Sequence, residues 1–167
     1  MASRTLRQLE DEGAIERQAI AAEQLDRWLD RSHRDLDLAA YATAVEDPER
    51  AMTLTYEAGL RACIVLLATA GFRLRSGEGH HRAALEAALV IGGEDLELSI
   101  SRLDDARRFR NSSLYGTSRP IGDMEMLRLT DDVEALLRTA GRRAGGGSET
   151  RNQKRARGRQ PPQGSRP

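Results

Sequence analysis

The feature that most constrains this chain is a helical segment without a polar face. The segment from Pro48 to Ala70 follows Asp47, which can cap a helix, and it is apolar nearly all round from Ala62 to Leu67. The longest apolar run, Ala62 to Phe72, has about half the length needed to cross a bilayer. We therefore expect this helix to lie at the centre of a soluble bundle, with other helices packed around it.

Further segments show helical periodicity and short connections, which favours an all-α, up-and-down bundle of five to six helices. These segments are 4–12, 15–45, 80–91, 95–115 and 123–140. The stripe of 15–45 consists of Leu25, Trp28, Leu29, Ser32, Leu36 and Ala39, and its opposite, solvent-facing side carries Asp26, Asp30, Arg34 and Asp37. The stripe of 123–140 consists of Met126, Leu129, Val133, Leu136 and Leu137. No internal repeat and no convincing strand is found, and aromatic residues make up only 4 % of the chain.

Several classes of protein are excluded by what the chain contains. The single cysteine, Cys63, excludes a disulfide framework and a cysteine-rich metal site, and its apolar surroundings predict an inert core thiol. His, Cys and carboxylate side chains do not cluster at ligand spacing, so no metal or other cofactor is expected. The first ten residues lack the apolar core of a secretory signal, which favours a cytoplasmic protein.

The zero net charge of the chain conceals a strong asymmetry. Residues 142–167 hold eight basic side chains and one acidic side chain, whereas residues 1–141 hold 18 basic and 25 acidic ones. The tail has three consecutive glycines and no aliphatic residue larger than Ala, so we expect a helical domain at 1–141 and a disordered basic tail at 142–167. Such a tail either holds nucleic acid electrostatically or is a solvated extension without a role.

The helix expected at 95–115 has an unusual stripe. After Leu103 the inward-facing positions become Arg107 and Arg110, followed by Asn111. Burying guanidinium groups is costly unless they meet carboxylates, a phosphate or a hydrated groove. The arginines therefore predict either a ligand site or ion pairs with acidic residues at a subunit interface.

The segment Arg107-Arg108-Phe109-Arg110-Asn111-Ser112-Ser113-Leu114-Tyr115 resembles the late-helix motif of HEPN domains (higher eukaryotes and prokaryotes nucleotide-binding). Three earlier segments, 56–62, 71–75 and 79–82, also resemble that family, and the resemblance extends over roughly residues 6–140. It implies a small helical bundle that dimerises through the motif helix. Many such domains are metal-independent ribonucleases of toxin–antitoxin or defence systems, encoded with a nucleotidyltransferase-family partner. Others bind nucleotides or are non-catalytic interaction modules.

One position departs from the family motif. Arg110 and Asn111 match R-N-x-x-x-H, but Tyr115 occupies the place of the histidine. An imidazole can accept the proton of a ribose 2′-hydroxyl near pH 7, whereas a phenol with a pKa of about 10 is a poor base. The candidate catalytic residues are therefore Arg110, Asn111 and Tyr115, and the candidate ligand-binding residues are Arg107, Arg110 and Asn111.

Two further features were considered as sites. His80 and His81 are adjacent at a helix start and could supply the missing acid–base group only if their loop reached the Arg110 cleft, which the sequence gives no reason to expect. The segment 77–79 could present backbone N–H groups to a phosphate, but it follows no evident strand and matches no nucleotide-binding fingerprint.

The sequence leaves three functions open. The first is a homodimeric HEPN-type module of a toxin–antitoxin or defence system that binds RNA or nucleotide, with ribonuclease activity weak or absent. The second is an active metal-independent endoribonuclease in which Tyr115, or a histidine from elsewhere, completes the site. The third is a structural or dimerisation partner whose arginines only form ion pairs.

Overall fold

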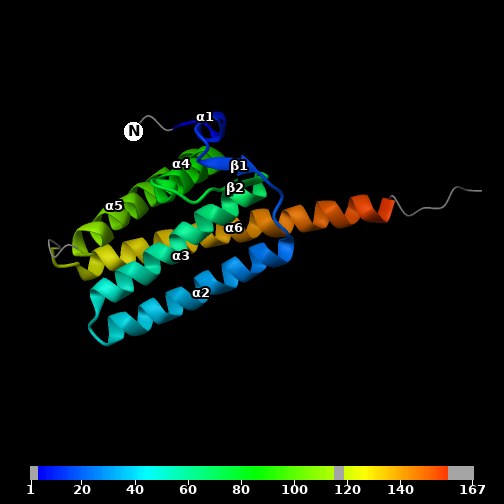
Figure 1. Ribbon diagram of the computed structural model, residues 1–167. Coiled ribbons are helices and arrows are strands. Elements are labelled where there is room, and N and C mark those ends of the chain that lie inside the picture. The colour runs from blue at the N-terminus through cyan, green and yellow to red at the C-terminus, as the bar shows by residue number, and fades with distance from the viewer. Residues whose placement is uncertain (1–3, 115–118, 158–167) are drawn as a thin grey trace, which may run out of the picture.

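A computed structural model describes residues 4–114 and 119–157, without the side chains of 113, 114 and 146–157. Helix α3 (Pro48–Thr69) runs through the middle of a mostly helical structure (Figure 1). The Asp47 side chain caps it by accepting a hydrogen bond from the Arg50 N–H at 3.1 Å, as the sequence predicts. Although α3 has the length and hydropathy of a membrane span, 72 % of its most apolar window is buried inside the bundle. It is therefore the core helix that the sequence predicts in a soluble bundle.

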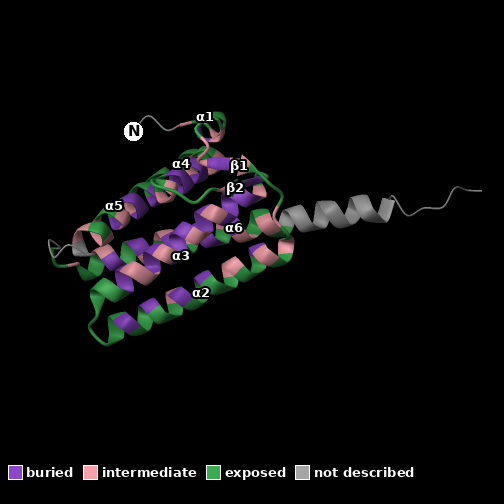
Figure 2. Ribbon diagram, viewed as in Figure 1, coloured by how far each residue is buried: buried purple, intermediate pink, exposed green. Residues whose placement is uncertain are grey.

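The other helical elements are α1 (Leu6–Asp11), α2 (Ala22–Ala44), α4 (His80–Gly92), a 3-10 turn (Gly93–Leu96), α5 (Glu97–Leu114) and α6 (Asp123–Arg157). Helices α2, α4, α5 and α6 bury apolar side chains in one core with α3, whereas α1 packs in a second, smaller core (Figures 1 and 2). All five predicted stripe residues of α6 are buried, and the predicted solvent-facing charged residues of α2 are exposed. The mostly helical fold class is thus confirmed, but α2 begins later than predicted, at Ala22, and α6 ends much later than predicted, at Arg157.

The structure contradicts the expectation that the chain has no strand. Residues Ile15–Arg17 (β1) pair antiparallel with Phe72–Leu74 (β2), with Glu16 opposite Arg73. Consequently, the helix expected at 15–45 begins only at Ala22. Each strand has three residues, too few to show an alternating pattern, and the partners lie more than 50 positions apart in the chain. Burial of Ile15 and Phe72 in a second small core with Leu9 holds this pair in place.

A buried carboxylate joins α2 to α3. Asp35 is only 1 % exposed, and it forms ion pairs with Arg61 Nη1 at 2.8 Å and with Arg31 Nε at 3.0 Å. Arg61 keeps 22 % of its side chain exposed, so the pair lies at the edge of the core. Removal of the carboxylate would leave the Arg61 guanidinium partly buried without a counter-charge.

Helix α5 is fixed against α3 by close packing at Gly59. A Cβ atom at this position would lie 2.8 Å from Leu103 Cδ1 on α5 and 2.9 Å from Val133 Cγ2 on α6. Only glycine therefore allows these three helices to approach so closely. This contact sets the position of the α5 residues that the sequence analysis identified as a candidate site.

Helix α6 continues beyond residue 141, where the sequence analysis expected a disordered tail to begin. It reaches Arg157, and its first residues past 141 contact the bundle: Arg143 donates a hydrogen bond to the Ile91 carbonyl at 3.1 Å, and Ala144 packs against the core. No proline interrupts the segment before residue 161, so the helix can propagate. Residues 158–167 lie outside the described residues, and the disorder of the tail stays a prediction.

Candidate functional site

Helix α5 carries the predicted site residues on its edge rather than in the core. Arg107 and Arg110 retain 23 % and 29 % of their side-chain exposure, and Asn111 is exposed. The expectation that the arginines take over the inward stripe after Leu103 is wrong in detail, because Ala106 fills the next core position. A small methyl group fits there without the desolvation cost of a guanidinium. Tyr115 lies outside the described residues.

Arg107 is held by a carboxylate of its own helix. Its Nε donates to Asp104 Oδ1 at 2.8 Å, while Arg108 donates to the other oxygen of the same carboxylate. Burial, the largest single influence, raises the pKa of Asp104, but the hydrogen bonds and charges of the two arginines together hold it below its ordinary value. Asp104 therefore stays ionised and orients Arg107 through Nε alone, so the outer guanidinium nitrogens are not used in this contact.

Arg110 faces α3 and is held more loosely. Its Nη2 lies 3.6 Å from Glu57 Oε1, which is an ion pair beyond hydrogen-bonding distance. Its guanidinium carbon lies 5.9 Å from the centre of the Tyr56 ring, within the range of a cation–π contact. Such a guanidinium can turn toward a stronger anionic partner without losing a good hydrogen bond.

The start of α4 reaches the same place. A cavity of about 230 Å³ is lined from one side by His80, His81 and the preceding loop, and from the other by Arg107 and Asn111. Gly79, at φ +76°, precedes the first residue of α4, and the first turn brings both histidines to this cavity. The structure thus places the histidine loop beside Arg107 and Asn111, a neighbourhood that could not be expected from the sequence.

His81 is the histidine that the protein interior positions. Its Nδ1 lies 2.9 Å from the hydroxyl of Tyr56, which is completely buried on α3. Burial is the main cause that raises the pKa of Tyr56, so its phenol stays protonated near neutral pH. A phenol can donate or accept a hydrogen bond, so it satisfies Nδ1 in either tautomer and leaves Nε2 for another partner.

The surroundings of His81 keep its imidazole neutral. Burial lowers its pKa most, followed by the positive charges of His80, Arg110 and Arg107. A neutral imidazole with one nitrogen held by a phenol can accept or donate a proton at the other, which is what acid–base chemistry requires. An anion bound beside the arginines would offset their positive charge and raise the pKa of His81 again.

These groups suit an oxyanion better than a metal. Arg107, Asn111 and His81 offer N–H donors to the cavity, and Glu78 is the acid among the lining residues. In the described part of the chain, no group of three or more His, Cys, Asp or Glu residues could hold a metal ion. The single thiol of the chain, Cys63, is fully buried with a pKa raised by burial to about 12, in keeping with the predicted inert core thiol.

The sequence therefore predicted the residues on the α5 side of the cavity but not His81 on the α4 side or Tyr56 behind it. Tyr56 and His81 lie in segments that carry the family resemblance. They are 25 residues apart, and no sequence spacing predicts that they contact each other or that His81 lies near α5. Comparison of the chain with protein-family models, curated proteins and solved structures finds no match. The proposed function therefore rests on the chemistry of the residues that line the cavity.

Proposed function

We propose that this chain is a HEPN-like helical module that binds RNA or a nucleotide through a phosphate group held by Arg107, Arg110 and Asn111. The observation that carries the proposal is the cavity between α4 and α5, where Arg107 and Asn111 of the predicted motif face His80 and His81. A phosphate presents several oxygens, and the cavity walls present guanidinium, amide and imidazole donors.

The state of the donors supports a ligand rather than a purely structural role. Arg107 uses Nε for Asp104, and Arg110 has only the long 3.6 Å contact with Glu57. Within the residues that the structure describes, the Asn111 side chain makes no hydrogen bond, although it lines the cavity. A phosphate would use capacity that the folded chain leaves unused, because charged hydrogen bonds contribute about 1.5–3 kcal/mol each.

The test is binding of a fluorescein-labelled 12-nucleotide RNA, with unlabelled AMP and ATP as competitors, measured by anisotropy on the full chain. Arg110→Ala should weaken binding about tenfold or more, given the energy of a charge-assisted hydrogen bond. Arg138→Ala is the matched control, because it removes an equal charge from an exposed pair with Glu134 on α6. Equal effects of the two substitutions would show only general electrostatic attraction and would refute the site.

A second candidate, a metal-independent endoribonuclease, is favoured by the position of His81. In this reaction His81 Nε2 takes the proton of a ribose 2′-hydroxyl, the 2′-oxygen attacks the adjacent phosphorus, and the 5′-oxygen leaves with a proton from the solvent. The products are a 2′,3′-cyclic phosphate and a 5′-hydroxyl. Tyr56 would position the imidazole through Nδ1, and Arg107 would stabilise the added negative charge.

Cleavage of a defined RNA in EDTA separates the two candidates. If His81→Gln retains RNA binding and abolishes cleavage, the chain is a nuclease with an acid–base histidine on α4. If the unaltered chain binds RNA without cleaving it, the binding module remains, with ribonuclease activity weak or absent. If it neither binds nor cleaves RNA and binds no nucleotide, the arginines serve only their ion pairs with Asp104 and Glu57.

The biological setting belongs to the same proposal and rests on the resemblance. We infer a cytoplasmic member of a toxin–antitoxin or defence system that forms a homodimer through α5 and acts with a nucleotidyltransferase-family protein. Sedimentation equilibrium tests the dimer, since Leu98→Asp alters an apolar side chain that is 61 % exposed on α5. A monomeric unaltered chain at micromolar concentration would remove this part of the proposal.

A further inference from the structure

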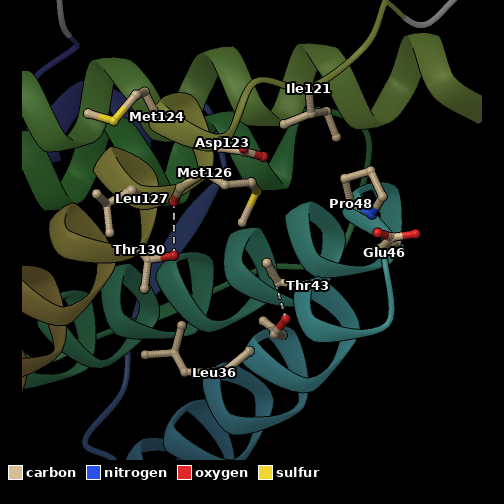
Figure 3. A pocket seen from close by; sticks show the side chains of 12 residues that line it. Leu36, Thr43, Glu46, Pro48, Ile121, Asp123, Met124, Met126, Leu127 and Thr130 are labelled. Atoms are coloured by element: carbon tan, nitrogen blue, oxygen red, sulfur yellow. Dashed lines mark hydrogen bonds between the residues drawn. The ribbon is translucent and has the colours of Figure 1, made fainter.

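A second cavity lies between the C-terminal half of α2 and the start of α6. Its volume is about 660 Å³, almost three times that of the phosphate-site cavity. Figure 3 shows the side chains of both helices around it. The lining residues are Leu36, Ala39, Ala40, Thr43, Glu46, Pro48, Ile121, Asp123, Met124, Met126, Leu127 and Thr130. We call this cavity the α2–α6 groove.

The groove is open because α2 presents small side chains where a neighbouring helix usually meets large ones. Ala39, Ala40 and Thr43 form its α2 wall. The two threonine hydroxyls are both used within their own helices: Thr43 donates to the Ala39 carbonyl at 3.1 Å and Thr130 to the Met126 carbonyl at 2.9 Å (Figure 3). Because both hydroxyls are already hydrogen-bonded, the walls of the groove are more apolar than the residue types suggest.

Two of the side chains that line the groove are large, apolar and exposed. Met124 and Leu127, in the first turns of α6, are 58 % and 54 % exposed. The exposed apolar side chains of α2 and the turn after it, Leu38, Tyr41 and Val45, lie about half a helical turn away from the groove residues of α2 and do not line it. Large apolar side chains that line a cavity and stay exposed indicate a binding surface.

The charge of the groove identifies its occupant. Among the described residues that line it, the charged ones are Glu46 and Asp123, both acidic, and both lie at the end near the α2–α3 turn. From Leu36 to Glu46 the groove follows α2 for about 15 Å, the length of roughly ten helical residues. We propose that the α2–α6 groove binds an amphipathic helix of a partner protein, with an apolar stripe in the groove and lysine or arginine beside the two acids.

Other occupants fit less well. The basic segment of this chain, 142–167, has no aliphatic residue larger than Ala to fill an apolar groove. It also starts from the distant end of α6, since Arg157 lies about 40 Å along the helix from Thr130 and the ten residues beyond it span at most about 35 Å. A second copy that packed groove against groove would offer no basic side chain to Glu46 and Asp123, because the described residues that line the groove include no lysine, arginine or histidine.

The test uses two acetylated and amidated 14-residue peptides with the same leucine stripe. One has the sequence LKKLLKLLKKLLKL, and the other has glutamate in place of every lysine. Titration calorimetry on the full chain should show binding of the lysine peptide and at least about tenfold weaker binding of the glutamate peptide. The combined change Glu46→Gln and Asp123→Asn should remove most of that preference, because it removes both charges of the groove.

Matched variants test the place of binding. Leu127→Asn, in the groove, should weaken binding of the lysine peptide about tenfold, whereas Val90→Asn, at an exposed apolar residue of α4 away from the groove, should leave that binding unchanged. Ala40→Trp fills the groove from an exposed position and should block binding without altering the thermal midpoint. Equal binding of both peptides, or equal effects of Leu127→Asn and Val90→Asn, would overturn the proposal. So would a dimer of the unaltered chain that Leu127→Asn turns into a monomer, because a second copy would then occupy the groove.

Discussion

A single methyl group at Gly59 should test whether α3 holds α5 and α6 in place as the structure shows. In Gly59→Ala the new Cβ would lie 2.8 Å from Leu103 Cδ1 and 2.9 Å from Val133 Cγ2, about 1 Å closer than normal carbon contacts. Both neighbours are completely buried, and the β-branched side chain of Val133 cannot easily rotate away. Overpacking of this kind costs about 1–3 kcal/mol.

The same substitution has an opposite effect that must be separated. Alanine stabilises a helix interior by about 1 kcal/mol relative to glycine. Gly141, in α6, is the matched control, because a Cβ there would meet nothing within 4 Å. We therefore expect Gly141→Ala to stabilise the chain by about 1 kcal/mol and Gly59→Ala to be about 1–3 kcal/mol less stable than Gly141→Ala.

Urea denaturation followed by far-ultraviolet circular dichroism measures the difference directly. For a chain of this size, the thermal midpoints of the two variants should differ by between about 2 and 12 °C. If Gly59→Ala stabilises the chain as much as Gly141→Ala, then α3, α5 and α6 do not pack as closely at residue 59 as the structure shows. The position of α5, and with it the geometry of the phosphate site, would then need revision.

Three further measurements test other parts of the structure. Asp35→Ala should destabilise the chain by about 3 kcal/mol, because it leaves Arg61 without its buried counter-charge. The control Glu134→Ala, at an exposed ion pair, should destabilise it by at most about 1 kcal/mol, and comparable losses of stability in urea denaturation would contradict the burial of Asp35. Folding lowers the pKa of His81 from 6.5, so the unfolded chain binds more protons and the stability of the fold should decrease as the pH falls below about 6.5. His81→Gln should make stability less dependent on pH in this range, and an unchanged dependence would argue against the buried imidazole. Burial raises the pKa of Cys63 from 9.0 to about 12, so the stability that the neutral buried thiol contributes is present below pH 9.0 and is lost as the pH rises toward about 12. Cys63→Ala should lose less stability over this alkaline range, and an equal loss in both proteins would show that the thiol is not its source.

The helices were predictable from the sequence because their signals are local. Asp47 and Pro48 begin α3, and the residues of α6 that recur at three- and four-residue steps are all buried. Periodicity of this kind depends only on the geometry of a single helix. The two short strands left no such signal, because each exists only through its pairing with a distant partner.

The candidate site also has a part that the sequence predicts and a part that only the tertiary structure shows. The sequence identified Arg107, Arg110 and Asn111, because polar residues in an apolar stripe are visible along one helix. Only the tertiary structure decided that Ala106 takes the core position and that His81, held by Tyr56, lies across the cavity from Arg107. The spacing of residues along the chain determines which side of a helix they occupy. The packing of helices that are distant in sequence determines which residues meet, and in this chain it brings an imidazole to the arginines.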